Sequence, residues 1–312
     1  MSTISFSAPA KIHLMGEHSA VHGKPAILAA INKRITVSIS TDEISSDKKT
    51  NVPETLQLVI ESAIKTQCSI SDIPKYFASV SSDIPVGLGL GSSAAMSAAF
   101  TACLLEFLDI KFDNALLFKI AYEGEKLFHG NPSGGDLAVS IEGGLLYFRK
   151  EFEFLKSFSH LPFPISKNIK PFVIINSGKP DESTLEMVKK VGEKKLANQE
   201  TINTIFENQE LQTKNLVLSL KDGDEDLLIS SIKIGESNLE KLNVVGETAK
   251  EIIRNVEKLG GSAKISGGGG IKNGSGMLLA YHSNKQVLLD LAVKYKLESE
   301  ITTIDERGII KE

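Results

Sequence analysis

The stretch Pro85-Val-Gly-Leu-Gly-Leu-Gly-Ser-Ser-Ala-Ala95 carries the strongest structural signal in this chain. Its alternating glycines let the backbone adopt conformations that are closed to other residues and let it approach a ligand closely. The Ala- and Leu-rich run that follows, residues 92–106, predicts a helix with Ser92 as its N-cap. Because a glycine loop that leads into a helix N-terminus presents free N–H groups, phosphate is the usual anion there. The stretch therefore predicts a site for a nucleoside triphosphate.

The loop alone leaves other interpretations open. Gly89, Gly91 and Ala94 also match the loose dinucleotide fingerprint G-x-G-x-x-[GA], which requires a second strand and an acidic residue about 20 residues later. Residues 113–127 predict a helix at that place, which argues against a dinucleotide-binding oxidoreductase. The Walker pattern G-x-x-x-x-G-K-[ST] does not occur. A glycine-rich turn without a ligand is the third alternative.

The composition is ordinary for a globular protein. At 312 residues the chain is long for one hydrophobic core, so two domains are expected. A net charge of −4, with 41% hydrophobic and 24% charged residues, gives no reason to expect nucleic acid as a partner. No apolar run reaches the roughly 20 residues of a membrane span, and no secretory signal is visible. Because Cys68 and Cys103 are too few for a disulfide framework or a zinc site, we expect a cytoplasmic protein.

Periodicity predicts an α+β chain with two parts. In the first part we expect strands over 4–8, 35–40 and 76–82, helices over 52–69, 92–108 and 113–128, and a hairpin over 137–148 that turns at Gly143–Gly144. Residues 160–170, with two prolines, are the best linker candidate. In the second part we expect strands over 171–176, 262–266, 276–282 and 301–304, a helical region of about 70 residues broken near 222–224, and helices over 248–259 and 284–296. This order, with its extra helices, is typical of a ferredoxin-like sandwich.

Three further clusters contain side chains suited to chemistry. Lys11, Glu17 and His18 lie in one segment, Glu125 and Asp136 in a second, and residues 264–270 end in four consecutive glycines. A carboxylate near a helix C-terminus, where Glu125 is expected, is disfavoured by the helix dipole, and a bound cation would compensate for it. Purely structural roles stay open for each cluster: a hydrogen-bonding His18, an exposed Glu125, an Asp136 without a catalytic role, and a mobile glycine loop.

Together the four clusters resemble the GHMP kinase superfamily and, within it, the mevalonate kinase family. Three ordered motifs carry the resemblance over most of the chain: residues 9–11 with 16–26, residues 85–95, and residues 267–270. The string Gly16-Glu-His-Ser-Ala-Val-His-Gly-Lys-Pro25, joined to His129-Gly-Asn-Pro-Ser-Gly-Gly-Asp136, is specific to mevalonate kinases. The resemblance implies an α+β GHMP kinase fold with two domains. These would be an N-terminal ribosomal protein S5 domain 2-like domain over residues 1–165 and a C-terminal ferredoxin-like α/β sandwich over residues 166–312.

The resemblance also implies an activity and a set of site residues. The chain would use ATP and Mg²⁺ to phosphorylate the C5 hydroxyl of (R)-mevalonate in isoprenoid biosynthesis. Lys11 and Asp136 would be catalytic, and Ser93 and Glu125 would hold Mg²⁺. The substrate would contact Lys11, Glu17, His18, Asp136 and Thr184, with Ser183 as the alternative to Thr184. The phosphates would lie on Pro85, Gly87, Leu88, Gly89, Leu90, Gly91, Ser92, Ser93 and Ala94, with Gly267, Gly268 and Gly269 as a third glycine loop.

The implied roles agree with the chemistry of phosphoryl transfer. This reaction requires an aligned nucleophile and a neutralised γ-phosphate more than it requires covalent help. Asp136 can accept the proton of the alcohol, and Lys11 favours the ionised form of Asp136. The residues themselves leave open whether Asp136 is a true base or an orienting group.

Some features leave alternatives beside this assignment. The third motif lacks the alanine that is usual in the family and continues into a polar stretch before Met277, so the register of its glycines stays open. A related kinase, such as a phosphomevalonate kinase, would require an additional cation near the acceptor. A catalytically silent nucleotide-binding homologue would have lost Lys11, Glu125 or Asp136, and all three are present. We expect small-molecule partners, no nucleic acid and no membrane, and a homodimer stays an open alternative.

Overall fold

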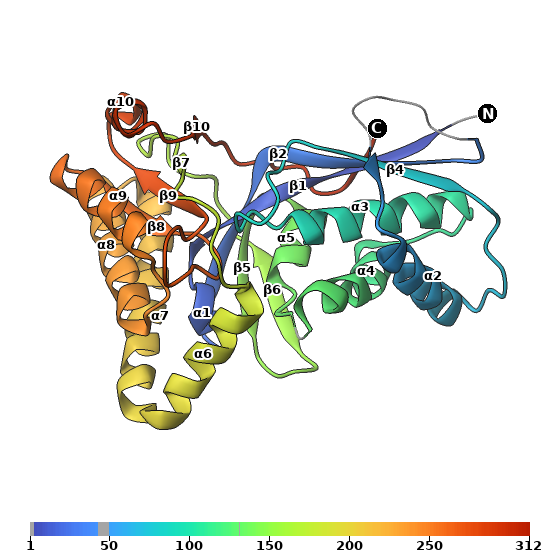
Figure 1. Cartoon of the computed structure of the whole chain (residues 1–312), viewed down its shortest axis with the longest axis horizontal. Coiled ribbons are helices and arrows are strands. Elements are labelled where there is room, and N and C mark those ends of the chain that lie inside the picture. The colour runs from blue at the N-terminus through green and yellow to red at the C-terminus, as the bar shows by residue number, and fades with distance from the viewer. Residues whose placement is uncertain (1–2, 43–49, 131) are drawn as a thin grey trace.

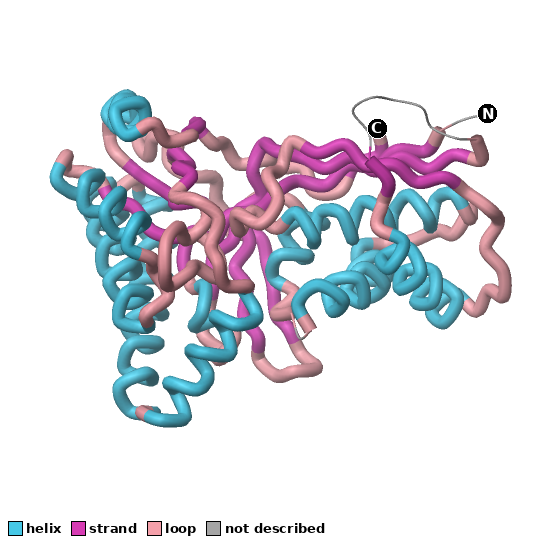
Figure 2. The backbone as a smooth tube through the Cα atoms, viewed as in Figure 1, coloured by secondary structure: helices cyan, strands magenta, loops and turns pink. Residues whose placement is uncertain are grey.

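The structure of the chain is a computed structural model that describes residues 3–42, 50–130 and 132–312. Asn131, which belongs to the predicted string from His129 to Asp136, lies outside the described residues. The chain forms two antiparallel sheets, each covered by helices, and the sheets meet near the middle of the molecule (Figures 1 and 2). Among the described residues, no helix has both the length and the apolar character that crossing a membrane requires.

The first sheet has seven strands and is built mainly from the first half of the chain. Its strands are β1 (Ile4–Met15), β2 (Ala26–Ser40), β3 (Thr50–Asn51), β4 (Phe77–Ser82), β5 (Leu145–Lys150), β6 (Lys156–His160) and β11 (Ile310–Lys311). The order is β11-β1-β2-β4-β3, and β5 pairs with both β2 and β6. The helices of this part are α1 (Glu17–Ala20), α2 (Glu54–Cys68), α3 (Ser92–Phe107), α4 (Asn114–His129) and α5 (Gly135–Glu142). Figure 1 shows α2 to α5 together on one face of the sheet.

Helix α3 is the central element of this layer. It is rich in alanine, and its residues from Ala94 to Leu105 are buried except for Met96. A helix that is apolar on all sides must be buried on all sides, and α3 packs between strands β1 and β2 and helix α4. Its small side chains let the helix approach the sheet closely, which fixes the position of its N-terminus.

The second sheet has four strands in the order β10-β7-β9-β8. These strands are β7 (Val173–Asn176), β8 (Ser262–Ile265), β9 (Met277–Tyr281) and β10 (Ser299–Ile301). The helices of this part are α6 (Thr184–Ala197), α7 (Gln199–Asp222), α8 (Glu225–Leu242), α9 (Glu247–Lys258) and α10 (Lys285–Tyr295). Numbered along the chain, the four strands lie in the order 4-1-3-2 of a ferredoxin-like sandwich, so the predicted fold class is confirmed. The five helices described in this part are three more than such a sandwich requires, and α7 and α8 run side by side (Figure 1).

Hydrogen bonds around the glycine loop join the two sheets. The Lys11 N–H donates to the carbonyl of Leu90 at 3.0 Å, which ties β1 to the glycine loop before α3. The Met277 N–H donates to the carbonyl of Leu88 at 2.9 Å, which ties the same loop to β9 of the second sheet. The His13 N–H donates to Ser266 Oγ at 2.9 Å and ties β1 to the segment after β8. Three segments that are far apart in the sequence therefore meet around the glycine loop.

The structure corrects several of the expected elements. The predicted hairpin over residues 137–148 is wrong, because residues 135–142 form helix α5 and only β5 follows as a strand. The strand expected over 301–304 lies at Ser299–Ile301 instead, with Ile304 in an isolated bridge to Ile31. The first strand does not end at residue 8 but continues to Met15.

Two further differences concern the helices and the domain division. The helical region of the second part has an additional break at Asn198, between α6 and α7. The division into residues 1–165 and 166–312 stays a prediction. The last strand, β11, pairs with β1 and so returns to the first sheet.

Candidate active site

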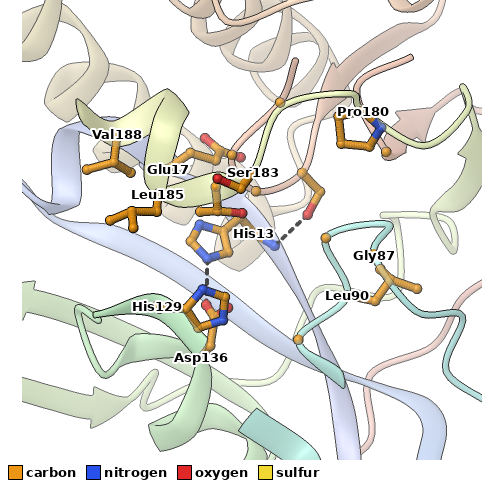
Figure 3. Close-up of a pocket in the computed structure, with 18 of the residues that line it drawn as sticks. His13, Glu17, Gly87, Leu90, His129, Asp136, Pro180, Ser183, Leu185 and Val188 are labelled. Atoms are coloured by element: carbon orange, nitrogen blue, oxygen red, sulfur yellow. Dashed lines mark hydrogen bonds and ion pairs between the residues drawn. The ribbon is translucent and has the colours of Figure 1, made fainter. Parts of the chain in front are cut away.

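A cavity of about 440 Å³ lies where the two sheets meet (Figure 3). This volume suits a small-molecule ligand. It is lined by nearly every residue that the sequence singled out: Lys11, Glu17, His18, Gly87, Leu88, Gly89, Leu90, Gly91, Ser92, Ser93, Glu125, Asp136, Ser183, Thr184, Gly267, Gly268 and Gly269. Two predicted phosphate-binding residues lie apart from it. Ala94 is buried in α3, and Pro85 lines a separate hollow with Lys33 and Asp83.

The glycine loop presents the N-terminus of α3 to the cavity. Gly91 is the N-cap of this helix, with φ of 72°, and no side chain makes a capping hydrogen bond. The prediction of Ser92 as the N-cap is therefore wrong, because Ser92 is the first residue of the helix. A side chain at Gly91 would place its Cβ 2.7 Å from Lys11 Cγ, so only glycine fits this turn. An uncapped helix start leaves N–H groups available for an anion.

The third glycine loop packs directly against the first. A Cβ at Gly89 would lie 2.5 Å from the carbonyl oxygen of Ser266, which closes the space between the two loops to any side chain. Gly268 lies beside Thr184, the first residue of α6, since a Cβ at Gly268 would be 3.0 Å from Thr184 Oγ1. Ser183 is the N-cap of α6 and its Oγ accepts a hydrogen bond from the Glu186 N–H. Both residues of the Ser183/Thr184 alternative line the cavity, but Ser183 already has a structural role.

The ammonium group of Lys11, the ring of His13 and the N-terminus of α5 all lie close to the carboxylate of Asp136. Lys11 Nζ lies 3.0 Å from Asp136 Oδ2, and His13 Nε2 lies 3.0 Å from Asp136 Oδ1. Asp136 stands in the first turn of α5, where the helix dipole favours a carboxylate. Burial alone would raise the pKa of Asp136, but Lys11 and His13 outweigh it and hold that pKa well below its usual range. Asp136 is therefore ionised at neutral pH.

A second carboxyl group, Glu125, has its pKa shifted in the opposite direction to that of Asp136. It projects from α4, is 2% exposed, and its Oε1 is buried without a hydrogen-bond partner. Burial, assisted by the charge of Asp136, raises the pKa of Glu125 to about 8. Ser93 Oγ lies 3.0 Å from His129 Nε2, which is itself 3.9 Å from Glu125 Oε2.

These residues fit a magnesium ion. A buried carboxylate oxygen without a partner is satisfied by a cation, and Mg²⁺ is usually held by one or two protein oxygens together with substrate phosphates. The described part of the chain contains no group of three or more His, Cys, Asp or Glu side chains that would hold a metal without such help. Ser93 and Glu125 are thus suitable for an ion that arrives with a nucleotide.

Glu17 and His18 line the cavity, but part of their bonding capacity is used within the protein. Lys264 Nζ, on β8, donates to Glu17 Oε1 in an ion pair that is almost fully buried. His18 Nε2 donates to the carbonyl of Gly268 at 3.0 Å. Burial lowers the pKa of His18, so its ring is neutral. The predicted contact of both residues with a substrate stays a prediction.

Among the cavity residues that the sequence analysis missed are His13, His129 and Lys179, and the two histidines had a visible signal. His13 follows Lys11 by two residues on a strand, so the two side chains share a face. His129 follows Glu125 by four residues on a helix and also shares its face. Lys179 gave no such signal. Its Cε would lie 3.0 Å from a Cβ at Gly87, so its side chain covers the glycine loop.

Comparison with known proteins identifies the family of this chain. The fold is that of a GHMP-type kinase, and the family model described as GHMP kinases N terminal domain matches residues 54–144. A mevalonate kinase of Archaeoglobus fulgidus is 32% identical over 271 residues, which are 85% of this chain and 88% of that protein. A mevalonate kinase of Pyrococcus furiosus is 31% identical and covers 97% of this chain and 96% of its own. The chain therefore belongs to the mevalonate kinase family.

A solved structure supports the fold independently. The mevalonate kinase of L. major in complex with R-mevalonate aligns with a TM-score of 0.78, over 97% of this chain and 96% of that one. Its sequence is 19% identical, so this likeness concerns the fold alone.

Proposed function

We propose that this chain transfers the γ-phosphoryl group of ATP to the C5 hydroxyl of (R)-mevalonate. One observation carries the proposal: a single cavity brings together the uncapped start of α3, the Lys11–Asp136 pair and the buried Glu125. We infer the substrate from the relatives, which are named as mevalonate kinases. The residues gathered in the cavity support the chemistry that such a transfer requires.

The nucleotide would lie against the two glycine loops. The free N–H groups at the start of α3 would bind its phosphates, and Lys179 would add a positive charge above Gly87. Ser93 and Glu125 would hold Mg²⁺, which neutralises phosphate charge when it is bound. A cation beside Glu125 would also keep that carboxylate ionised despite its burial.

The acceptor alcohol would lie against Asp136 and Lys11. Because its pKa is lowered, Asp136 is a weak base, and we assign it the orienting role. It would accept a hydrogen bond from the hydroxyl group and direct the hydroxyl oxygen at the γ-phosphorus. The new bond forms between this oxygen and the phosphorus as the bond to the β–γ bridging oxygen breaks, and the hydroxyl proton leaves to solvent or to the product phosphate. Lys11 would stabilise the negative charge on the acceptor oxygen.

The charges in the cavity favour an acceptor without a phosphate of its own. Among the described residues that line it, Lys11 and Lys179 are the only lysines or arginines. Lys11 is held by Asp136, and Lys179 covers the nucleotide loop. A phosphorylated acceptor would thus find no free cation, which disfavours phosphomevalonate.

The test is the release of ADP from Mg-ATP in the presence of mevalonate, phosphomevalonate, homoserine or galactose. We expect turnover with mevalonate alone and a product phosphorylated on the C5 oxygen, identified by ³¹P NMR. Turnover with another acceptor would overturn the substrate assignment. Nucleotide binding without turnover across the panel would point to the catalytically silent alternative.

A further inference from the structure

His13 occupies a position that the proposed reaction has not yet used. It lies on β1 two residues after Lys11, so both side chains leave the same face of the strand toward Asp136. Its Nε2 is 3.0 Å from Asp136 Oδ1, while Lys11 holds Oδ2. The backbone N–H of His13 donates to Ser266 Oγ at the edge of the third glycine loop, which ties this part of β1 to that loop. The ring itself is oriented by its contact with Asp136.

The surroundings of the ring determine its protonation. An ionised carboxylate can only accept, so the hydrogen of the imidazole must be on Nε2. The other nitrogen, Nδ1, is buried without any partner, and a hydrogen placed there would be a buried donor without an acceptor. Burial, together with the charge of Lys11, lowers the pKa of His13. The ring is thus a neutral donor.

Other charged and titratable groups act on this pair from the neighbouring elements. Lys11 on β1 and Glu17 and His18 on α1 act on His13, and Glu125 and His129 on α4 act on Asp136. Glu17 and Asp136 raise the pKa of His13, but burial of the ring and the charge of Lys11 outweigh them.

We propose that His13 is a positioning residue for phosphoryl transfer, which donates a hydrogen bond from Nε2 to Oδ1 of Asp136. This inference rests on the proposed function. Because Lys11 contacts one oxygen and His13 contacts the other, the carboxylate group of Asp136 is held in one orientation. The acceptor hydroxyl then meets a fixed lone pair. A freely rotating carboxylate would spend part of its time misaligned, and alignment is most of what this reaction requires.

The alternative role for His13 is that of a general base, and two substitutions separate the roles. His13→Gln retains a neutral N–H donor of similar reach but has no basic nitrogen. His13→Leu fills a similar space without a donor. For a positioning residue, His13→Gln should retain most of the turnover. His13→Leu should lose turnover roughly ten- to hundredfold, the usual effect of losing a hydrogen bond to a charged group.

The experiment measures kcat and KM for mevalonate and for ATP in the wild type and both variants, between about pH 6 and pH 9. Binding of ADP, measured by calorimetry, controls for folding of the site, because His13 does not belong to the glycine loop that would bind the nucleotide. We expect the His13→Gln profile to run parallel to that of the wild type. In ¹⁵N spectra of the wild type, the imidazole signals of His13 are identified by their absence from the His13→Gln variant. These signals should show the neutral ring with its hydrogen on Nε2 from about pH 6 to pH 9.

Three results would overturn the inference. They are a His13→Gln variant as inactive as His13→Leu, a His13→Leu variant as active as the wild type, and a His13 ring that titrates within the range studied. A wild type that does not phosphorylate mevalonate would instead contradict the proposed function. In that case the ¹⁵N spectra would still decide whether His13 is a neutral donor to Asp136.

Discussion

Replacing Glu236 with glutamine should remove a pH-dependent loss of stability from the core beside the active site. Glu236 lies on α8 and is 0% exposed. Its Oε2 accepts a hydrogen bond from the Ile265 N–H at 3.0 Å, and its Oε1 is buried without a partner. Burial raises the pKa of Glu236 to about 8, although Lys264 opposes the rise. The folded protein thus holds this carboxyl protonated at neutral pH.

The size of the effect follows from the two protonation equilibria. In the unfolded chain the carboxyl has its ordinary pKa of 4.5. The pKa of Glu236 is higher in the folded protein than in the unfolded chain. Its contribution to the free energy of unfolding is therefore fully present below pH 4.5 and is lost as the pH rises toward 8. Each pH unit inside this window changes the free energy of unfolding by up to about 1.4 kcal/mol. Relative to a variant that does not titrate, the wild type should lose about 3 kcal/mol between about pH 5 and pH 7.5.

Urea unfolding followed by far-UV circular dichroism measures this difference, since the chain has no tryptophan. Glu236→Gln introduces a buried amide that costs about 1–3 kcal/mol at every pH. That constant cancels when the difference from the wild type is compared across pH. Glu251→Gln, at an exposed position on α9, is the matched control and should give a difference independent of pH. Parallel stability curves for the wild type and Glu236→Gln would refute the argument.

Three further substitutions test the assigned site. Asp136→Asn should reduce turnover by about 10²–10⁴ in an ADP-release assay while ADP binding persists, because it removes the charge that orients the acceptor; near-normal turnover would remove Asp136 from the reaction. Glu125→Gln should raise the Mg²⁺ concentration needed for half-maximal activity. The wild type itself should bind Mg²⁺ more weakly as the pH falls below about 8, since a protonated Glu125 is a poor ligand; identical Mg²⁺ titrations would contradict the ligand assignment. Lys179→Met should raise the KM for ATP only a few-fold, because this lysine is exposed, and a change in the KM for mevalonate alone would place it on the other substrate.

The sequence predicted best those parts of the fold that depend on long periodic segments. Helix α3 and the glycine loop before it were recognisable because an Ala-rich run and alternating glycines have few other uses. The short apolar run over 137–141 was assigned to a strand and forms α5 instead, because periodicity does not separate a short buried helix from a short strand. With that error, the placement of Asp136 at a helix N-terminus was also missed.

Contacts between segments that are distant along the chain could not be predicted from the sequence for a different reason. The ion pair of Lys264 with Glu17 joins residues 247 positions apart, and no local pattern indicates which buried lysine meets which buried glutamate. The position of Lys179 above Gly87 depends on the path of the segment between β7 and α6, which has no periodicity. His13 differs from both. Its spacing from Lys11 placed it on the right face, but only the structure shows what that face meets.

The two carboxylates of the cavity show how one site provides opposite chemistry from the same functional group. Asp136 has two donors and a helix N-terminus around it, so it remains charged without any ligand. Glu125 has burial and a neighbouring negative charge, so it is charged only when a cation joins it. Pairs of acids whose environments drive their pKa values apart commonly divide the roles of an active site. This division supports the proposed roles, in which Asp136, ionised at neutral pH, contacts the acceptor and Glu125, which must lose a proton, holds the metal. Binding of the magnesium–nucleotide complex should therefore release a proton below about pH 8, whereas binding of mevalonate should not.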